Sequence, residues 1–425
     1  MDRLIVRGGR RLRGTVRVAG NKNAAGPTLA AALLTDEPIR LRNLPRIGDI
    51  EVFLDLLRGL GVEIDVNGEG ALVASAARVS TGRVDAQLGR QIRMSLLVAG
   101  PLLARLGHAE LPPPGGDVIG RRRIDTHLLA LQALGAKLDA GRDGYRLSAG
   151  RLHGADILLD EMSVTATENV LLAAVLADGQ TIIRNAASEP HVQDLCALLN
   201  GMGARVTGVG TNSLVIDGVE RLHGTDFTLG PDYLEVGSFI GLAAVTRSAL
   251  RIADCRPDQH GMTRIMLNRL GVDWRVDGND IVVPDDQMLT VVDDHGNAVP
   301  KIDDAPWPGF PADLISIATV IATQARGAVL IHEKLYESRL FFVDRLIAMG
   351  ARIVLCDPHR AVVIGPSPLY GQPLVSPDIR AGMALLIAAL CAEGESVIDN
   401  VHQIDRGYER IEERLLALGA DVQRV

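Results

Sequence analysis

One phrase recurs six times along the 425 residues: a leucine-rich helical stretch reaches a glycine and then runs into a short strand-like segment. The copies read LRGLGVEI, LQALGAKL, LNGMGARV, LNRLGVDW, LIAMGARI and LLALGADV. Their glycines are Gly61, Gly135, Gly203, Gly271, Gly350 and Gly419. Repetition of this kind constrains architecture more strongly than local propensity does. A glycine at this place predicts a left-handed cap that ends a helix before a β-strand.

A second helical pattern precedes each copy of the phrase. These stretches cover residues 22–34, 92–106, 164–177, 233–246, 312–323 and 379–392. They are small and apolar on nearly all sides, which predicts helices buried inside a domain. Each is followed by a β-branched segment in which alternation replaces the helical period, as in QTIIRNA and GAVLIHE. The repeating unit is therefore predicted to be helix, strand, helix, strand.

The chain is longer than one hydrophobic core usually organises, so we expect an α/β protein of two domains with three units each. The first domain is predicted over residues 21–230. The second is predicted to be discontinuous, over residues 1–20 and 231–425, because the opening strand MDRLIVRGG has no preceding helix and needs a sheet to complete. A repeat predicts stability and says little about chemistry.

Composition excludes several classes of function. A net charge of -8 without a dense basic run disfavours binding to nucleic acid or to an acidic membrane surface. The cysteines lack the spacing of a zinc site or a disulfide framework, so we expect no metal and no cofactor. They are Cys196, Cys255, Cys356 and Cys391. Without a signal-like segment or a membrane-length apolar run, the protein is expected to be cytoplasmic.

The first candidate site residues lie in GNKNAAGP, where Lys22 and Asn23 open an otherwise apolar helix. A simpler interpretation makes Asn23 the helix cap and leaves Lys22 exposed. However, a cation at a helix N-terminus opposes the macrodipole, and this favours an anionic ligand between the two.

A second candidate segment is LPPPGGDVIGRRRIDTH, residues 111–127. Three prolines followed by two glycines join a stiff stretch to a mobile one, which is typical of a lid over a site. Asp117 lies at its tip, before Arg121, Arg122 and Arg123. A solvated charge run is the alternative interpretation.

In the second half, acidic and arginine residues recur together at predicted helix starts. They are Asp313 in FPADL, Glu337 and Arg339 in YESRL, Asp378 and Arg380 in PDIR, and Asp405 and Arg406 in IDRGYER. One such pair is commonly a structural ion pair. Four recurrences at equivalent positions of the units are harder to explain as structural pairs alone.

Taken in order, MDRLIVRGG, NKNAA, PGGDVIGRR, SVTATEN, FPADL, ESR, PDIRA and HQIDRGYERIEERL make the whole chain resemble the UDP-N-acetylglucosamine enolpyruvyl transferases of the EPSP synthase superfamily. The resemblance implies two inside-out α/β barrel domains with the active site in the cleft between them. It also implies transfer of the enolpyruvyl group of phosphoenolpyruvate to the sugar 3-hydroxyl, with loss of phosphate through a tetrahedral intermediate. This is the first committed step of peptidoglycan synthesis.

The resemblance assigns roles to individual residues. Phosphoenolpyruvate is expected to contact Lys22, Asn23, Arg122, Arg339, Arg380 and Arg406. UDP-N-acetylglucosamine is expected to contact Asn23, Arg93, Arg122, Arg123, Ser163, Val164, Thr165, Asp313 and Leu335. Catalysis is expected from Lys22, Asp117, Asp313 and Arg406, with Asp313 as the general base.

The chain departs from the family pattern at three of these positions. Arg123 and Thr165 stand where many relatives have proline and glycine. Asp117 replaces the loop cysteine that supplies a proton, so an acid role requires Asp117 to hold a proton when the lid closes. Desolvation favours the protonated acid, and nearby arginines oppose it.

Three alternatives remain. The sister transferase acts on shikimate 3-phosphate, although its NAGTA and PGSKS motifs are not found here. A modified UDP-sugar is a second acceptor to consider. The third alternative is a paralogue that binds UDP-sugars without catalysis.

Overall fold

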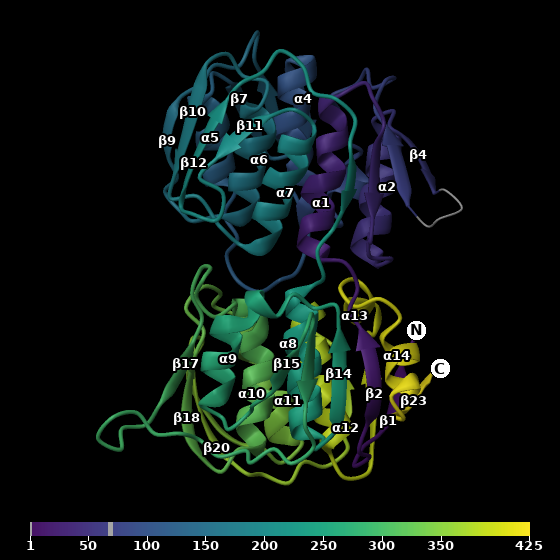
Figure 1. Ribbon diagram of the computed structural model, residues 1–425, viewed down its shortest axis with the longest axis vertical. Coiled ribbons are helices and arrows are strands. Elements are labelled where there is room, and N and C mark those ends of the chain that lie inside the picture. The colour runs from purple at the N-terminus through teal and green to yellow at the C-terminus, as the bar shows by residue number, and fades with distance from the viewer. Residues whose placement is uncertain (1, 67–70) are drawn as a thin grey trace. The chain divides into compact units, whose positions relative to one another are not determined.

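The computed structural model of the chain describes residues 2–66 and 71–425 (Figure 1). Backbone contacts divide the chain into two compact units. Unit 1 comprises Met1–Ala19, Val118–Arg122 and Pro231–Val425, and unit 2 comprises Gly20–Asp117 and Arg123–Gly230. Met1, the first residue of the predicted opening strand, lies outside the described residues.

Three small sheets in unit 1 have the strand orders β21-β22-β1-β23, β15-β16-β14-β2 and β17-β18-β20-β19. Their strands are β1 (Leu4–Arg7), β2 (Arg13–Arg17), β14 (Ala249–Ala253), β15 (Arg275–Asp277), β16 (Asp280–Val283), β17 (Lys301–Asp303), β18 (Gly327–His332), β19 (Arg352–Asp357), β20 (Arg360–Gly365), β21 (Pro373–Val375), β22 (Glu395–Asp399) and β23 (Asp421–Arg424). The opening strand β1 pairs antiparallel with both β22 and β23, so it completes a sheet with the chain's last residues, as predicted.

Unit 2 has sheets with the orders β11-β12-β10-β9, β13-β3-β5-β4 and β6-β8-β7 among its described residues. Their strands are β3 (Ile39–Arg42), β4 (Glu63–Val66), β5 (Leu72–Ser75), β6 (His108–Leu111), β7 (Lys137–Gly141), β8 (Gly144–Ser148), β9 (Asp156–Leu158), β10 (Gln180–Arg184), β11 (Arg205–Thr207), β12 (Ser213–Asp217) and β13 (Asp226–Thr228).

Both units follow one plan. The strand after each buried helix pairs antiparallel with one neighbour, as β18 does with β20. In five of the sheets it also pairs parallel with an edge strand, as β18 does with β17. The prediction of two strands per unit was therefore incomplete, because in five of the six repeats the strand after the outer helix turns back as a hairpin. The six repeat glycines all have φ between 80° and 111°. The predicted left-handed caps are confirmed.

The predicted buried helices are confirmed as the inner helices of both units. In unit 1 they are α8 (Tyr233–Val245), α10 (Ile315–Gln324) and α12 (Ile379–Cys391). In unit 2 they are α1 (Lys22–Ala30) with η1 (Ala31–Leu34), η2 (Arg93–Val98) with α4 (Ala99–Leu106), and α6 (Val164–Ala174). Every residue of α8 is buried. No helix in the described ranges has the length and apolar character needed to cross a membrane.

The outer helices end two or three residues before the repeat glycines. They are α2 (Gly48–Gly59), α5 (Asp125–Ala133), α7 (Pro190–Gly201), α9 (Gly261–Asn268), α11 (Val343–Ala348) and α14 (Ile411–Ala417). Shorter helical turns are α3 (Ala86–Gly89), η3 (Pro257–His260), η4 (Ala312–Leu314), η5 (Arg339–Phe342) and α13 (His402–Asp405).

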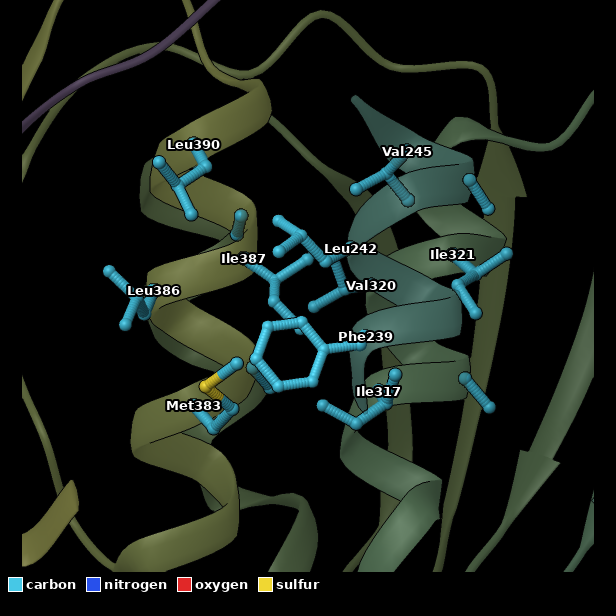
Figure 2. Close-up of a cluster of buried hydrophobic side chains, with 14 of the residues drawn as sticks. Phe239, Leu242, Val245, Ile317, Val320, Ile321, Met383, Leu386, Ile387 and Leu390 are labelled. Carbon is cyan, nitrogen blue, oxygen red and sulfur yellow. The ribbon is translucent and has the colours of Figure 1, made fainter. Parts of the chain in front are cut away.

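The core of unit 1 forms where its inner helices meet (Figure 2). Phe239 from α8, Ile317 from α10 and Ile387 from α12 are each no more than 1% exposed. A Cβ atom at Gly241 would lie 2.4 Å from Cγ2 of Ile317, so only glycine permits this approach of α8 to α10. The inner helices are thus held rigidly, and their N-termini provide fixed positions for polar side chains.

Candidate active site

Lys22 is the first residue of α1, and the structure shows it buried and paired rather than exposed. Its side chain is 11% exposed, and Nζ lies 2.8 Å from Oδ2 of Asp49. The helix cap is Asn21, whose Oδ1 accepts hydrogen bonds from the backbone N–H groups of Asn23 (2.8 Å) and Ala24 (3.3 Å). The interpretation that Asn23 caps the helix was wrong, because a cap precedes the first helical turn and Asn21 occupies that position.

Asp49 is a residue that the sequence reasoning missed. It lies in the first turn of α2, where an acidic side chain is common and therefore carries little signal. Its carboxylate balances the Lys22 ammonium at the positive end of α1. A bound anion at this place would share Lys22 with Asp49.

Two arginines predicted to bind the nucleotide-sugar, Arg93 and Arg123, contact each other in unit 2. Arg93 opens η2 and donates from Nη2 to the backbone oxygen of Arg123 at 2.7 Å. Arg123 donates from Nε to Asp125 at 3.0 Å, and its Nη2 lies 3.5 Å from Asp160. The hydrogen bond that Arg123 donates to Asp125, together with the charges of both carboxylates, raises the pKa of Arg123. The guanidinium is thus a permanent cation with a fixed orientation.

The start of α6 supplies the next group. Ser163 is the N-cap, and its side chain accepts a hydrogen bond from Ala166 N–H at 3.4 Å. Val164 and Thr165 form the first turn and are partly exposed. Backbone N–H groups at such a helix start favour an anion.

His127 links α5 to this helix start. Its Nε2 lies 3.0 Å from Oγ1 of Thr165, and its Nδ1 lies 3.2 Å from Nδ2 of Asn169. Burial, and secondarily the charge of Arg93, lowers the pKa of His127 to about 3. The imidazole is therefore neutral at physiological pH.

The predicted lid has neither helix nor strand between Leu111 and Asp125. At its base, a Cβ at Gly115 would lie 1.9 Å from the backbone oxygen of Arg90, so the loop passes directly over that backbone. At its tip Asp117 is partly buried and Val118 is 91% exposed. Motion of this lid stays a prediction.

Residues 118–122 belong to unit 1 and contact the segment after β18. Ser338 N–H donates to the backbone oxygen of Ile119 at 3.1 Å. Arg121 N–H donates to Oε2 of Glu337 at 3.0 Å. Gly120 has a φ of +132°, and a Cβ there would lie 2.9 Å from the Glu337 backbone nitrogen. The segment that carries Arg122 is therefore attached to residues 337–338.

Asp313 lies in η4 at the start of α10 and joins two predicted arginines. Its Oδ1 accepts a hydrogen bond from Nη2 of Arg339 at 2.6 Å, and its Oδ2 accepts one from Nε of Arg380 at 3.1 Å. Both arginine side chains are 5% exposed, whereas that of Asp313 is 26% exposed. Hydrogen bonds to the charged form favour the carboxylate, so Asp313 is an ionised acceptor that solvent or substrate can reach.

The two arginines are held from behind by aromatic rings. Arg339 lies over Tyr336 with its guanidinium carbon 5.3 Å from the ring centre, and Arg380 lies over Tyr408 at 5.2 Å. The Tyr408 hydroxyl is 2.9 Å from Oγ of Ser238. Burial opposes the charge of Arg339, yet Asp313 and its acidic neighbours raise its pKa, and the pKa of Arg380 is also raised.

Other predicted pairs have separate roles. Arg406 donates from Nη1 to Oε1 of Gln403 at 2.7 Å and lies two residues before Tyr408. Asp405 instead binds both guanidinium nitrogens of Arg424, at 2.7 and 2.9 Å, and is structural. Asp378 caps α12 by accepting hydrogen bonds from the N–H groups of Arg380 and Ala381.

Leu335 is 42% exposed and follows β18. The structure therefore brings Asp313, Arg339 and Arg380 together in unit 1, and Arg93, Arg123, His127 and Thr165 together in unit 2. Within residues 2–66 and 71–425, no three His, Cys, Asp or Glu side chains gather as a metal-ligand set.

Comparison with known proteins identifies the family. Residues 6–415 match the family described as EPSP synthase (3-phosphoshikimate 1-carboxyvinyltransferase). Proteins named UDP-N-acetylglucosamine 1-carboxyvinyltransferase are 56% identical in Treponema denticola, over 100% of this chain and 99% of that protein, and 56% identical in Bradyrhizobium diazoefficiens, over 99% and 97%.

Solved structures extend the similarity to the fold. The enolpyruvyl transferase NikO from Streptomyces tendae has a TM-score of 0.88 at 27% identity and covers 100% of this chain and 99% of its own. EPSP synthase from Acinetobacter baumannii has a TM-score of 0.75 at 18% identity, with the same coverage. The family match and the full-length relatives lead to one conclusion: this chain belongs to the EPSP synthase family of carboxyvinyl transferases.

Proposed function

We propose that the chain transfers the enolpyruvyl group of phosphoenolpyruvate to the 3-hydroxyl of UDP-N-acetylglucosamine and releases phosphate. The observation that carries this proposal is the Asp313 carboxylate between two buried guanidinium groups. The full-length relatives that are 56% identical and carry the corresponding name support the choice of acceptor.

Asp313 is the general base in this proposal. It accepts the proton of the 3-hydroxyl as the oxygen attacks C2 of phosphoenolpyruvate, while C3 gains a proton. The tetrahedral intermediate then loses phosphate and a C3 proton, which restores the double bond. Positioned cations stabilise the charges that develop on the carboxylate and on the departing phosphate.

The two anionic groups of phosphoenolpyruvate require separate cations. We assign its carboxylate to Arg339 and Arg380, because guanidinium groups form bidentate contacts with carboxylates. We assign its phosphate to Lys22, Arg122 and Arg406. Asn23 follows Lys22 at the start of α1 and is assigned to both substrates.

The nucleotide-sugar is assigned to Arg93, Arg123, Leu335 and the α6 start. Arg123 adds a cation, and Thr165 adds a hydroxyl, at positions where many relatives have proline and glycine. Both features suit a diphosphate, which accepts hydrogen bonds on several oxygens.

Asp117 is assigned as the proton donor to C3 when the lid closes. A carboxyl group can donate this proton as a thiol can, provided that closure removes water from around it. We place the reaction at the first committed step of peptidoglycan synthesis and, because both substrates are cytoplasmic metabolites, we place the enzyme in the cytoplasm.

The test measures phosphate release from phosphoenolpyruvate with UDP-N-acetylglucosamine or with shikimate 3-phosphate as acceptor. We expect turnover with the nucleotide-sugar only. Asp313→Asn should lower kcat by about 10²- to 10⁴-fold, the usual contribution of a general base. It should still bind UDP-N-acetylglucosamine in a calorimeter.

Asp277→Asn is the matched control, because Asp277 is an exposed aspartate of unit 1 paired with Arg251. Its kcat should equal that of the parent. Turnover with shikimate 3-phosphate alone would support the sister reaction, and binding of the nucleotide-sugar without any turnover would support a non-catalytic binder. Either result would overturn the proposed function.

A further inference from the structure

Two carboxyl groups that the mechanism does not use are buried side by side in unit 1. Asp304 follows β17 and Glu333 follows β18, and both are 0% exposed. The strands are parallel, with Asp303 opposite His332. The next residue of each strand therefore emerges at the same sheet edge, and the two carboxyl groups lie within hydrogen-bonding reach of each other.

The turn after β18 wraps around this pair with its backbone. Lys334 N–H donates to Oδ1 of Asp304. Leu335 N–H is shared, at 3.2 Å from Oδ2 of Asp304 and 3.3 Å from Oε1 of Glu333. Tyr336 N–H donates to Oε1 of Glu333 at 3.1 Å. Three consecutive N–H groups thus take their positions from the two carboxyl groups.

That turn leads directly into the candidate active site. Tyr336 is the ring under Arg339, and Glu337 accepts the hydrogen bond from Arg121 N–H. Leu335 is one of the residues assigned to the nucleotide-sugar. Displacement of the turn would therefore move both the Tyr336 ring that supports Arg339 and the Glu337 side chain that holds residues 118–122.

The charges around Glu333 do not balance two buried carboxylates. Arg339 is the facing cation, yet its Nε is 4.0 Å from Oε2 of Glu333 while its Nη2 is 2.6 Å from Asp313. Neither Oε2 of Glu333 nor Nε of Arg339 has a hydrogen-bond partner among the described residues. The Lys334 ammonium points to Asp303 at 2.9 Å.

Among the described residues, no other side chain forms an ion pair with the Glu333 carboxyl group. His359 bonds through Nδ1 to the backbone oxygen of Glu333 at 2.7 Å, and Tyr336 is a buried phenol. Burial, and secondarily the charge of Asp304, raises the pKa of Glu333 to about 9. Two like charges this close in a dry interior repel each other strongly, so both groups are not ionised together at neutral pH.

We propose that Asp304 and Glu333 hold one proton between them and act as a positioning pair, in which the neutral Glu333 orders residues 334–336 and leaves the charge of Arg339 to Asp313 and the substrate anion. This inference rests on the proposed function for its kinetic consequence and on the buried geometry alone for the shared proton. When Glu333 loses that proton, its Oε2 competes with Asp313 for Arg339. Binding of phosphoenolpyruvate then weakens.

Infrared difference spectroscopy tests the shared proton without any substrate. At pH 7, parent minus Glu333→Gln should show the carbonyl band of a protonated carboxyl group. In the parent this band should disappear with a midpoint near pH 9. Two results would overturn the shared proton. The first is that the parent and Glu333→Gln give identical spectra at pH 7. The second is that the carbonyl band of the parent disappears near pH 4 to 5, as for an ordinary glutamate. Neither readout depends on the transferase activity.

Steady-state kinetics tests the positioning role. The KM of the parent for phosphoenolpyruvate should rise above pH 9, and Glu333→Gln should abolish that rise, because its amide oxygen still accepts from residues 335 and 336 but cannot ionise. Glu333→Ala removes the acceptor and should raise KM about tenfold at every pH, in the range expected for unsatisfied buried N–H groups.

Glu395→Gln is the control for a general effect of removing a glutamate, because Glu395 is an exposed partner of Arg7 in unit 1. It should keep the pH profile of the parent. Equal pH profiles for the parent and Glu333→Gln, or equal KM values for Glu333→Gln and Glu333→Ala, would contradict the positioning role.

Discussion

Replacing His127 with glutamine should remove part of the acid sensitivity of unit 2. His127 is 2% exposed, and the orientation of its ring is determined by Asn169. Oδ1 of Asn169 accepts from Gly100 N–H at 2.7 Å, so its Nδ2 must face Leu96 O and Nδ1 of His127. Nδ1 therefore accepts, and the ring proton lies on Nε2, which donates to Thr165.

The magnitude follows from the difference in proton affinity between the folded and unfolded chain. Burial and the charge of Arg93 lower the pKa of His127 from 6.5 to about 3. Below pH 6.5 His127 binds a proton in the unfolded chain but stays neutral in the folded chain, so the free energy of unfolding falls as the pH decreases from 6.5 to 3. At pH 5 the loss is roughly 2 kcal/mol, from about 1.4 kcal/mol per pH unit.

The assay compares the free energy of unfolding in urea at pH 7 and pH 5. The chain has two tryptophans, Trp274 and Trp307, and both lie in unit 1, so unit 2 is better followed by circular dichroism or by hydrogen exchange in α6. The His127→Gln variant should lose about 2 kcal/mol less than the parent between the two pH values. His153→Gln, at an exposed histidine of the same unit, should match the parent.

The pH-dependent difference is the diagnostic quantity, because the substitution also changes packing equally at both pH values. Equal losses of stability in the parent and in His127→Gln would refute the inference that the folded state holds a neutral ring. His260 in unit 1 has the same sign of effect, since burial lowers its pKa to about 4. The acid destabilisation of unit 1 that His260 causes should be seen in the tryptophan fluorescence, and it should be the same in the parent and in His127→Gln.

Two further predictions concern the lid and the core. The family resemblance implies that the epoxide fosfomycin alkylates the loop cysteine of related enzymes. It should leave Asp117 unmodified by mass spectrometry, because a carboxylate is a weaker nucleophile than a thiolate, whereas Asp117→Cys should gain the adduct. Time-dependent labelling of Asp117 itself would contradict this. Phe239→Ala should destabilise unit 1 by about 3–5 kcal/mol in urea unfolding, because the ring fills the contact between α8, α10 and α12 shown in Figure 2. A change below about 1 kcal/mol would show that the core rearranges to fill the space.

The repeat could be predicted from sequence because its signals are local. Gly61 and Gly350 mark helix ends through a backbone conformation that other residues adopt with strain, and both have positive φ as expected. The inner helices were predicted from composition, since a segment apolar on all sides has to be buried. The additional strands were missed because strands such as β9 and β13 have three residues each, are exposed at both ends and are recognisable only by their partners.

The site was predicted less completely. Asp313, Arg339 and Arg380 could be named from their motifs, but the motifs do not show that one carboxylate binds both arginines. Lys22 was identified, while its partner Asp49 was not, because an acidic residue in a first helical turn is common. Asn21 rather than Asn23 proved to be the cap, since the helix starts two residues earlier than the simpler interpretation assumed.

The sequence by itself determined the six-unit α/β architecture, the buried inner helices, the glycine caps and the set of charged residues available for chemistry. These depend on periodicity and on backbone preferences that act over a few residues. Only the tertiary structure decided that Glu333 lies beside Asp304, that Lys22 faces Asp49 and that His127 is neutral. Each of these depends on burial and on distances between residues far apart in the chain. The register of parallel strands and the packing of helices set those distances, and no local sequence pattern predicts them.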